Sequence, residues 1–576
     1  MKTKINAWKI IFSVLIALTI LGIVKALFVS LDVDESYAVA QAYRLVTGDR
    51  LMYDMWEPHQ FSAFLPAFFL YPFYMIRKNA DYCVIYLRLV GILIHLATGV
   101  FLWLTAKKKT GNMIADIIFI IHMNFLPKWV AMPEFELMHY WSMLLVFLIL
   151  YSAEERKNVF LYFPAGLIFG VSVLCYPTMV LVFPFFIIAL IVRKKAGGVL
   201  PFVLGTAVTG IATLAVILIN VPFSELPFFI SYILMDSSHT SAGMAYKTGT
   251  SLEQLKVQMT EAGIGTAISV IIALAVRVSD GSFKKKEVKV NSFISDILTI
   301  LSTGLCILTF IRFVFMNENQ FCMQIRYMVL VLLFIVLALK DRKKFGAELW
   351  YGLIPGILSI PAVFIITNMD INSVYVKAFS AVVAGMFILG RNYEESREKS
   401  SLKVTDIVID SALAASILLC LFTCRLLLIR VNGCLPVTVM AKTAKVENGP
   451  AAGVYVLKDQ ADAWNSSYES IKDIADSGKN VLYIGQEQLF YVTFCERVNV
   501  PSVQGTTVFN GMYERYYEVF PEKYPEIIVK DASFGSNPAY YYSPENEYIY
   551  TWITDNNGTK TILNNGYYEI LSVIRK

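Results

Sequence analysis

Two adjacent carboxylates, Asp34 and Glu35, are the residues of this 576-residue chain best placed to do chemistry. They follow an apolar run, residues 9–31, that is long enough to cross a bilayer as a helix, and a helical pattern over 36–46 comes next. Carboxylates at a membrane surface are costly unless they are solvated or used, so general acid–base chemistry is one interpretation. The alternative is structural, with Asp34 capping the helix that follows.

A second acidic group, Glu134 and Glu136, opens another apolar run at 137–152. Glu136 and His139 are three residues apart, which places them on one face of a helix. Carboxylates and imidazoles suit zinc or manganese, so a divalent metal is one interpretation of this pair. The other is an interfacial His139 with ordinary hydrogen bonds. We assign no metal and require no cofactor.

Three further polar residues lie inside apolar runs and favour structural roles. Arg88 is expected to form an ion pair, because an unpaired charge within a membrane is expensive. His95 and His122 are expected to pack or to form hydrogen bonds between helices.

The composition indicates the environment of these residues. The chain is 56% hydrophobic and only 16% charged, with a mean hydropathy of +0.56. Soluble domains are about 45–50% apolar and about 25% charged, so an ordinary soluble enzyme, a disordered chain and a nucleic-acid-binding domain are excluded. The eight cysteines form no CxxC pair and no disulfide framework.

The apolar runs predict a polytopic α-helical membrane protein with about 13 spans. Clusters of Lys and Arg at 107–109, 193–195, 284–286 and 340–344 alternate with loops that are almost free of them. This asymmetry predicts a cytoplasmic N-terminus and an extracytoplasmic C-terminus. The predicted spans are 9–31, 82–104, 112–130, 137–152, 158–175, 177–192, 198–220, 263–278, 293–316, 322–339, 346–366, 377–390 and 403–429.

Two outer loops, 32–81 and 221–262, are long enough to build a site. Within the first, the apolar run 61–76 is too short for a span, so we expect a helix that lies in the outer interface. The second contains Asp236 and His239 and a helical pattern at 251–261.

The last 146 residues have a net negative charge, whereas the rest of the chain is net positive, which predicts a separate C-terminal domain. Residues 431–576 hold 12 Lys and Arg against 17 Asp and Glu, whereas residues 1–430 hold 38 against 28. Short β-branched runs separated by helical patterns predict an extracytoplasmic α/β domain. One glycine, Gly485, follows a strand without a GxGxxG pattern, so a dinucleotide site is not indicated. The expected strands are 454–457, 481–484 and 527–529, and the expected helices are 461–476 and 510–520.

The stretch 31–60 resembles the first outer loop of the GT-C glycosyltransferases, especially that of protein O-mannosyltransferases and lipid A aminoarabinose transferases. The chain departs from the family at Glu57-Pro58-His59, where many relatives have Lys-Pro-Pro or His-Pro-Pro, and His59 is the substitute for the missing basic group. The matching motifs, in order, are Asp34-Glu35, Tyr37, Gly48-Asp49, Tyr53-Asp54 and Pro58-His59.

Two later segments agree with this resemblance. The stretch 132–140 resembles the family's second acidic motif, which we match to Glu136, with Glu134 as the alternative. Arg326-Tyr327 resembles the Arg-Tyr motif that opens a late span. About 13 spans followed by an outer C-terminal domain also resemble the aminoarabinose transferases.

The resemblance implies an inverting transfer of a sugar from a polyprenyl-phosphate carrier to an acceptor hydroxyl at the outer face of a plasma membrane. We expect this membrane to be bacterial. The resemblance also implies Asp34 as general base, Glu35 as the residue that orients either Asp34 or the acceptor, and Glu136 as a further catalytic carboxylate. The acceptor is a glycan, a lipid or a protein, and no nucleic acid is involved. The substrate-binding residues that it implies are Tyr37, Tyr53, Asp54, His59, Arg326 and Tyr327, with Arg326 on the donor phosphate.

Two other classes of function stay open at this point. A transporter or lipid flippase would place ionisable residues at mid-span and would show two similar halves. A scaffold or sensor that displays the C-terminal domain would not need the acidic pair.

Overall fold

The structure is a computed structural model in which most of the chain is helical. The residues that it describes are 2–235, 243–279, 297, 327–367, 374–399, 426–430, 436–438, 441–475, 478–485, 487–504, 511–531, 551–555 and 557–574.

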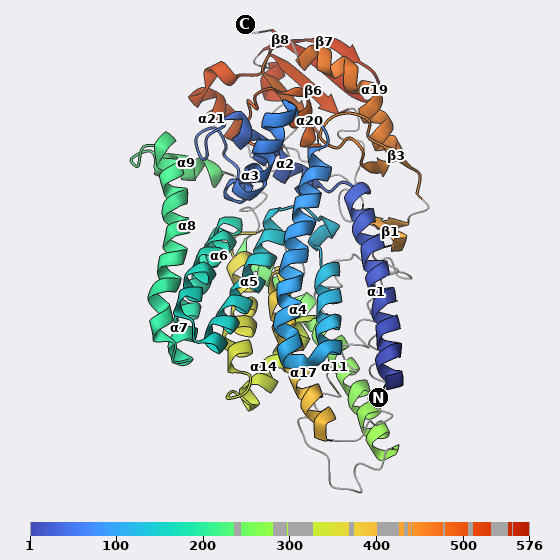
Figure 1. The fold of residues 1–576 in the computed structure, drawn as a ribbon. Coiled ribbons are helices and arrows are strands. Elements are labelled where there is room, and N and C mark those ends of the chain that lie inside the picture. Colours follow the sequence, from blue (N-terminus) through green and yellow to red (C-terminus); the bar gives the residue numbers. More distant parts are fainter. Residues whose placement is uncertain are drawn as a thin grey trace.

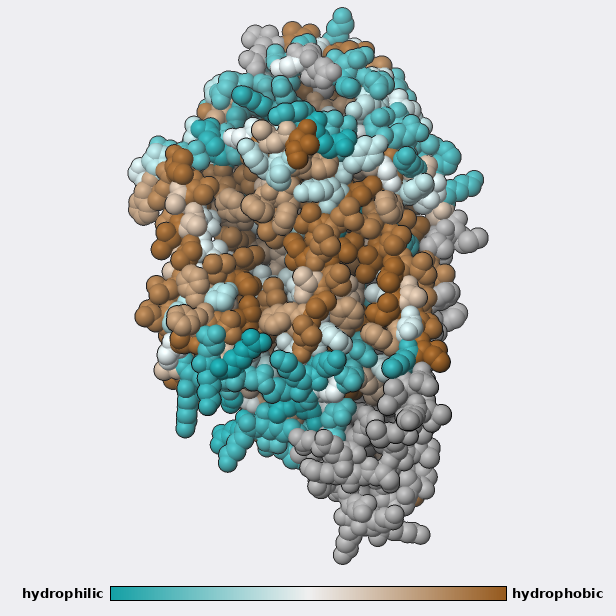
Figure 2. Space-filling model, in the orientation of Figure 1, coloured by the Kyte–Doolittle hydropathy of each residue, from teal (hydrophilic) through white to brown (hydrophobic). Residues whose placement is uncertain are grey.

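Long helices form one end and the middle of the molecule, and we call this part the apolar body (Figure 1). On the face shown in Figure 2, hydrophobic residues cover the middle of the molecule, with hydrophilic residues above and below them. The main helices of the body are α1 (Lys2–Phe28), α4 (Cys83–Asn124), α5 (Phe135–Arg156), α6 (Tyr162–Cys175), α7 (Phe183–Val192), α8 (Val199–Asn220), α11 (Met244–Ser279), α14 (Tyr327–Lys340), α15 (Ile354–Phe364) and α17 (Phe379–Lys399).

Four segments of the described chain are helical, long and apolar enough to cross a membrane: Trp8–Phe28, Cys83–Asn124, Phe135–Arg156 and Ala196–Asn220. Other expected spans correspond to shorter apolar helices, such as Val159–Cys175 and Pro177–Val192. The predicted total of about 13 spans is not confirmed, because the run at 293–316 and most of 403–429 lie outside the described residues.

The helix α4 is a hairpin of the two runs expected at 82–104 and 112–130. Its backbone leaves the helical conformation at Gly111, where φ is 75°. A residue with a Cβ would be strained there, so glycine permits the turn. The two arms meet through His95 and His122, whose rings stack with centroids 4.0 Å apart. Each of these histidines also forms a hydrogen bond between a ring nitrogen and the other's carbonyl, as expected from the sequence.

Close backbone contact joins α6 to α8. A Cβ at Gly166 would lie 2.0 Å from the carbonyl oxygen of Phe202, and one at Gly205 would lie 2.1 Å from that of Phe163. Small residues therefore let these two helices approach each other, as they do in helix pairs within membranes.

Ion pairs join the ends of several helices at the end of the apolar body that lies away from the C-terminal domain. Arg193 pairs with Glu154, and Arg391 with Glu348. These cations belong to or adjoin the basic clusters that the sequence places on one side of the membrane.

The C-terminal domain has the α/β character that was expected. Strand β5 (Val481–Ile484) is parallel to β6 (Ile527–Asp531), and α20 (Leu489–Phe494) and α21 (Met512–Val519) lie between them in the chain. Two antiparallel strands, β8 (Tyr568–Ile574) and β7 (Gly558–Asn564), extend this sheet in the order β5-β6-β8-β7. The expected strand at 454–457 is present as β4 (Tyr455–Leu457), but it pairs with β3 (Thr443–Lys445) in a separate sheet. The helix α19 (Lys458–Ala475) follows β4 in the chain. A further antiparallel pair is formed by β1 (Leu428–Arg430) and β2 (Pro436–Thr438).

Residues 32–81, which we call the first outer loop after their predicted position, share one hydrophobic core with the C-terminal domain. In the loop, α2 (Val33–Thr47) and α3 (Phe64–Arg77) lie directly below the C-terminal sheet (Figure 1). Tyr37 and Trp56 of the loop belong to the same buried cluster as Tyr491 and Tyr516 of the C-terminal domain. The helix expected at 61–76 is therefore present as α3, preceded by a 3-10 turn, η1 (Gln60–Ala63).

Candidate functional site

The acidic pair lies in the first turn of α2, as expected, but the helix is capped by a different residue. Asp32 is the N-cap, and its Oδ1 accepts a hydrogen bond of 3.0 Å from the backbone N–H of Asp34. The interpretation of Asp34 as the helix cap is therefore wrong. The side chain of Asp34 is half-buried.

Glu35 forms the ion pair that the sequence predicts for Arg88. Nε and Nη2 of Arg88 lie 2.6 Å from Oε1 and Oε2 of Glu35, so the contact is bidentate. Both side chains are at most 3% exposed. Planar guanidinium–carboxylate pairs of this kind fix orientation as well as charge.

The start of α5 has a similar arrangement. Glu134 is the N-cap, and its carboxylate accepts hydrogen bonds from the backbone N–H groups of Glu136 and Leu137. The carboxylate of Glu136 lies 2.6 Å from Nζ of Lys377, and both side chains are buried. Lys377 belongs to η7 (Tyr375–Ala378) and lies 4.8 Å from the centroid of the Tyr176 ring.

Lys377 is a residue that the sequence analysis missed. It opens the apolar run 377–390, directly after an outer loop that is almost free of basic residues. A lone lysine at the mouth of a span was the available signal, because such a charge needs a partner.

An aromatic bridge joins the starts of α2 and α5. The ring of His59 stacks on Phe135 with centroids 4.2 Å apart and meets Tyr37 edge-on at 6.4 Å. Tyr176 contacts Phe135 edge-on at 5.8 Å and His139 at 5.3 Å. The structure thus connects three of the sequence-predicted site segments, at residues 34–37, 59 and 134–139.

The metal interpretation gains no support from the described part of the chain. Nδ1 of His139 lies 2.8 Å from the hydroxyl of Ser172. Among the described residues, no group of three or more His, Cys, Asp or Glu side chains could hold a metal ion.

Tyr53 and Asp54 lie in the interface between the first outer loop and the C-terminal domain. The ring of Tyr53 packs against Phe520, with centroids 5.1 Å apart. Asp54 accepts hydrogen bonds from Arg50 and from Nζ of Lys523, the latter at 2.6 Å. Burial opposes the charge of Asp54, but these two cations prevail and lower its pKa to about 2.

A second charged network fixes the same interface. Glu57 is fully buried, and its carboxylate accepts hydrogen bonds from Arg44 at 2.8 Å and Gln41 at 2.6 Å. The backbone N–H of Val503, in the C-terminal domain, donates a third at 3.1 Å. Glu57 therefore ties α2 to the C-terminal domain.

Two predicted residues near 326 cannot be placed in the site. Arg326 lies outside the described residues, and Tyr327 begins α14.

In the second outer loop, Asp236 and His239 also lie outside the described residues. The helix predicted at 251–261 is part of α11.

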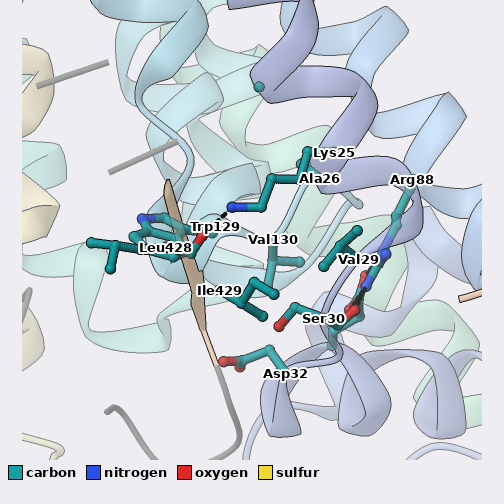
Figure 3. Close-up of a pocket in the computed structure, with 12 residues that line it drawn as sticks. Lys25, Ala26, Val29, Ser30, Asp32, Arg88, Trp129, Val130, Leu428 and Ile429 are labelled. Carbon is teal, nitrogen blue, oxygen red and sulfur yellow. Dashed lines mark hydrogen bonds and ion pairs between the residues drawn. The ribbon is translucent and has the colours of Figure 1, made fainter. Parts of the chain in front are cut away.

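A pocket opens behind the start of α2, between α1, the turn at Trp129 and β1 (Figure 3). Lys25 lines it and donates a hydrogen bond to the carbonyl of Leu428. Asp32, Glu35 and Arg88 line it as well. Buried charges of both signs therefore surround this pocket next to the acidic pair.

No family model matches the chain, and no curated protein matches it. The likeness to GT-C glycosyltransferases therefore depends on the motifs of this sequence alone.

Proposed function

We propose that this protein is a membrane glycosyltransferase of GT-C type. It moves a sugar from a polyprenyl-phosphate carrier to an acceptor hydroxyl at the outer face of the membrane. The observation that carries the proposal is the connection between the two acidic helix starts, at Asp34 and Glu136. The ring of His59 makes this connection, because it stacks on Phe135 and meets Tyr37 edge-on. An apolar body below these residues suits a lipid-linked donor.

The proposed reaction is an inverting displacement at the anomeric carbon. Asp34 accepts the proton of the acceptor hydroxyl as its oxygen attacks, and the new C–O bond forms while the bond to the phosphate oxygen breaks. A carboxylate within hydrogen-bond reach contributes about 10²–10⁴-fold to such a step. The leaving group is polyprenyl phosphate, whose developing charge requires a fixed cation.

Two residues are candidates for that cation. The sequence motif proposes Arg326, whose planar fork suits phosphate. The described residues add Lys377, a buried ammonium held by Glu136 at 2.6 Å at the same helix start. In this proposal Glu136 sets the position of Lys377, and Tyr37 and His59 form the aromatic wall of the site.

The runner-up is a transporter or lipid flippase. Among the described residues, the buried ion pair Glu35–Arg88 and the half-buried pair Glu154–Arg193 both lie near helix ends. The histidine pair of α4 lies inside the apolar body, but its rings are engaged in hydrogen bonds between helices. These features favour an enzyme at the interface over a path through the body.

The test uses purified full-length protein in vesicles that contain a synthetic polyprenyl-phosphate sugar. Mass spectrometry should detect free polyprenyl phosphate together with a glycosylated acceptor, and cell-surface glycans should change when the protein is absent. Movement of intact donor across the bilayer without cleavage would support a flippase instead. A reporter fused after Lys576 should lie outside the cell, and a cytoplasmic reporter would contradict the orientation.

A further inference from the structure

Arg88 binds the chain on both sides of Asp34. Besides its bidentate contact with Glu35, its Nη1 donates to the carbonyl oxygen of Leu27 at 2.9 Å. Its Nη2 donates to the carbonyl oxygen of Ser30 at 2.6 Å. Leu27 and Ser30 precede Asp34 and Glu35 follows it, so one buried guanidinium brackets the segment that carries the proposed base.

The bend in this segment is strained. Ser30 has a φ of 76°, in the left-handed region that a residue with a Cβ rarely adopts. Its carbonyl is held by Arg88, and its backbone N–H donates to the carbonyl oxygen of Tyr455 at 2.8 Å. Strained backbone persists where surrounding contacts fix it, and such positions cluster at functional sites. The apolar body and the C-terminal domain therefore fix the bend between α1 and α2 together.

We propose that Arg88 is a positioning residue that sets the orientation of Asp34 by clamping Ser30 and Glu35. This inference rests on the proposed function. In it, Glu35 acts through Arg88 and does not touch the acceptor. Lysine would not replace Arg88, because one ammonium cannot reproduce a bidentate contact and two carbonyl contacts.

The pocket shown in Figure 3 makes the clamp accessible to experiment. Arg88 lines this pocket with Lys25, Trp129 and Ile429, so there is space beside its side chain. Guanidinium ion added to an Arg88→Ala protein has room to enter and to replace the missing group. Urea has a similar shape without the charge and serves as the control additive.

The central test compares Arg88→Lys with the wild-type protein. A misplacement of about 1 Å can cost about 10²-fold in rate, so kcat should fall by about 10- to 100-fold while the KM for donor stays unchanged. Amide hydrogen exchange over residues 30–37 should become faster. The matched control is Arg193→Lys, which alters an arginine–carboxylate pair at the opposite end of the body and should change neither kcat nor exchange over 30–37.

Guanidinium should restore part of the kcat of Arg88→Ala, and urea should not. If Arg88→Ala fails to fold, the double variant Glu35→Gln/Arg88→Met removes both charges and should still show a reduced kcat. A wild-type kcat in folded Arg88→Lys, or unchanged exchange over 30–37, would overturn the inference. A wild-type protein with no transferase activity would overturn the proposed function instead, and the exchange experiment would still decide whether the clamp exists.

Discussion

The starts of α2 and α5 are built from the same parts. Each helix begins with a buried acidic cap, Asp32 in one case and Glu134 in the other. Each then has a glutamate in its first turn, Glu35 or Glu136, that pairs with a buried cation. Acidic residues are favourable at helix N-termini because the helix dipole is positive there. Most of the acidity at both starts thus has a structural explanation.

The two starts differ in their cations and in one extra carboxylate. Arg88 has a fixed planar fork with four hydrogen bonds, whereas Lys377 presents a single ammonium group beside an aromatic ring. Only the α2 start has a further carboxylate, the half-buried Asp34, between its cap and its paired glutamate. The comparison suggests a division of roles, with Asp34 for proton transfer and Lys377 for the phosphate charge.

Loss of the α5 cation should strongly reduce both activity and stability. Lys377→Ala should lower kcat/KM for the donor by about 10²-fold, because the phosphate loses a fixed charge. It should also destabilise the fold, since removal of one partner from a buried ion pair costs about 3–5 kcal/mol. Donor titrations and thermal unfolding measure the two effects.

A double variant separates these two effects. Glu136→Gln/Lys377→Met removes both charges of the pair and should recover most of the stability without recovering activity. Normal donor use by folded Lys377→Ala would show that Lys377 does not bind the phosphate. Arg326 would then be the candidate for that role. In that case Arg326→Ala should weaken donor use and Arg326→Lys should restore little of it.

Substitutions in the interface between the first outer loop and the C-terminal domain should lower the stability of the fold without changing the catalytic rate. Lys523→Met removes a hydrogen bond of 2.6 Å to Asp54, which should cost about 1–3 kcal/mol. Activity per folded molecule should stay within about twofold of wild type. Lys560→Met, on the exposed strand β7, is the control and should be neutral. Loss of activity at unchanged stability would place Asp54 in the substrate site, as the resemblance implies.

The smallest effect should be a pH dependence at Glu487, which adjoins α2. Burial raises the pKa of this carboxyl to about 7, although a hydrogen bond from the backbone N–H of Leu489 opposes the rise. In the unfolded chain the pKa is about 4.3, so the folded protein binds an extra proton between these values. The stability that this proton contributes is complete below the unfolded pKa and is lost as the pH rises through about 7.

In Glu487→Gln the side chain at this position is neutral at every pH. It should raise the unfolding midpoint by about 2–4 °C at pH 8 and should have little effect at pH 4. Thermal unfolding at both pH values measures this difference. An equal effect at pH 4 and pH 8 would show that Glu487 does not titrate on folding.

Local patterns were enough to predict much of the fold. Apolar runs predicted the helices of the body, and β-branched runs predicted β5 and β6. The terminal hairpin β7–β8 was missed, although Asn565-Gly566 between alternating residues is a turn signal. The sharing of one core by the first outer loop and the C-terminal domain was not predictable, because it joins Trp56 to Tyr516 across more than 400 residues of sequence.

The site was predictable as a set of acidic motifs, but the partners of these residues were not. A sequence shows that Glu35 and Glu136 lie at helix starts, whereas their cations come from distant segments of the chain. Lys377 was missed for this reason. The structural alternative for Asp34 was the cap of α2, a place that Asp32 takes in the structure. Only the packing of helices decides which of several neighbouring carboxylates is neutralised.

The most direct test of the central claim is the transfer rate of Asp34→Asn from a polyprenyl-phosphate sugar. Asparagine keeps the size of the side chain but cannot accept the proton, so turnover should fall by about 10²-fold or more while donor binding changes little. Asp81→Asn, on the same outer loop, should retain wild-type turnover. Turnover of Asp34→Asn within a few-fold of wild type would contradict the claim and remove Asp34 as the base.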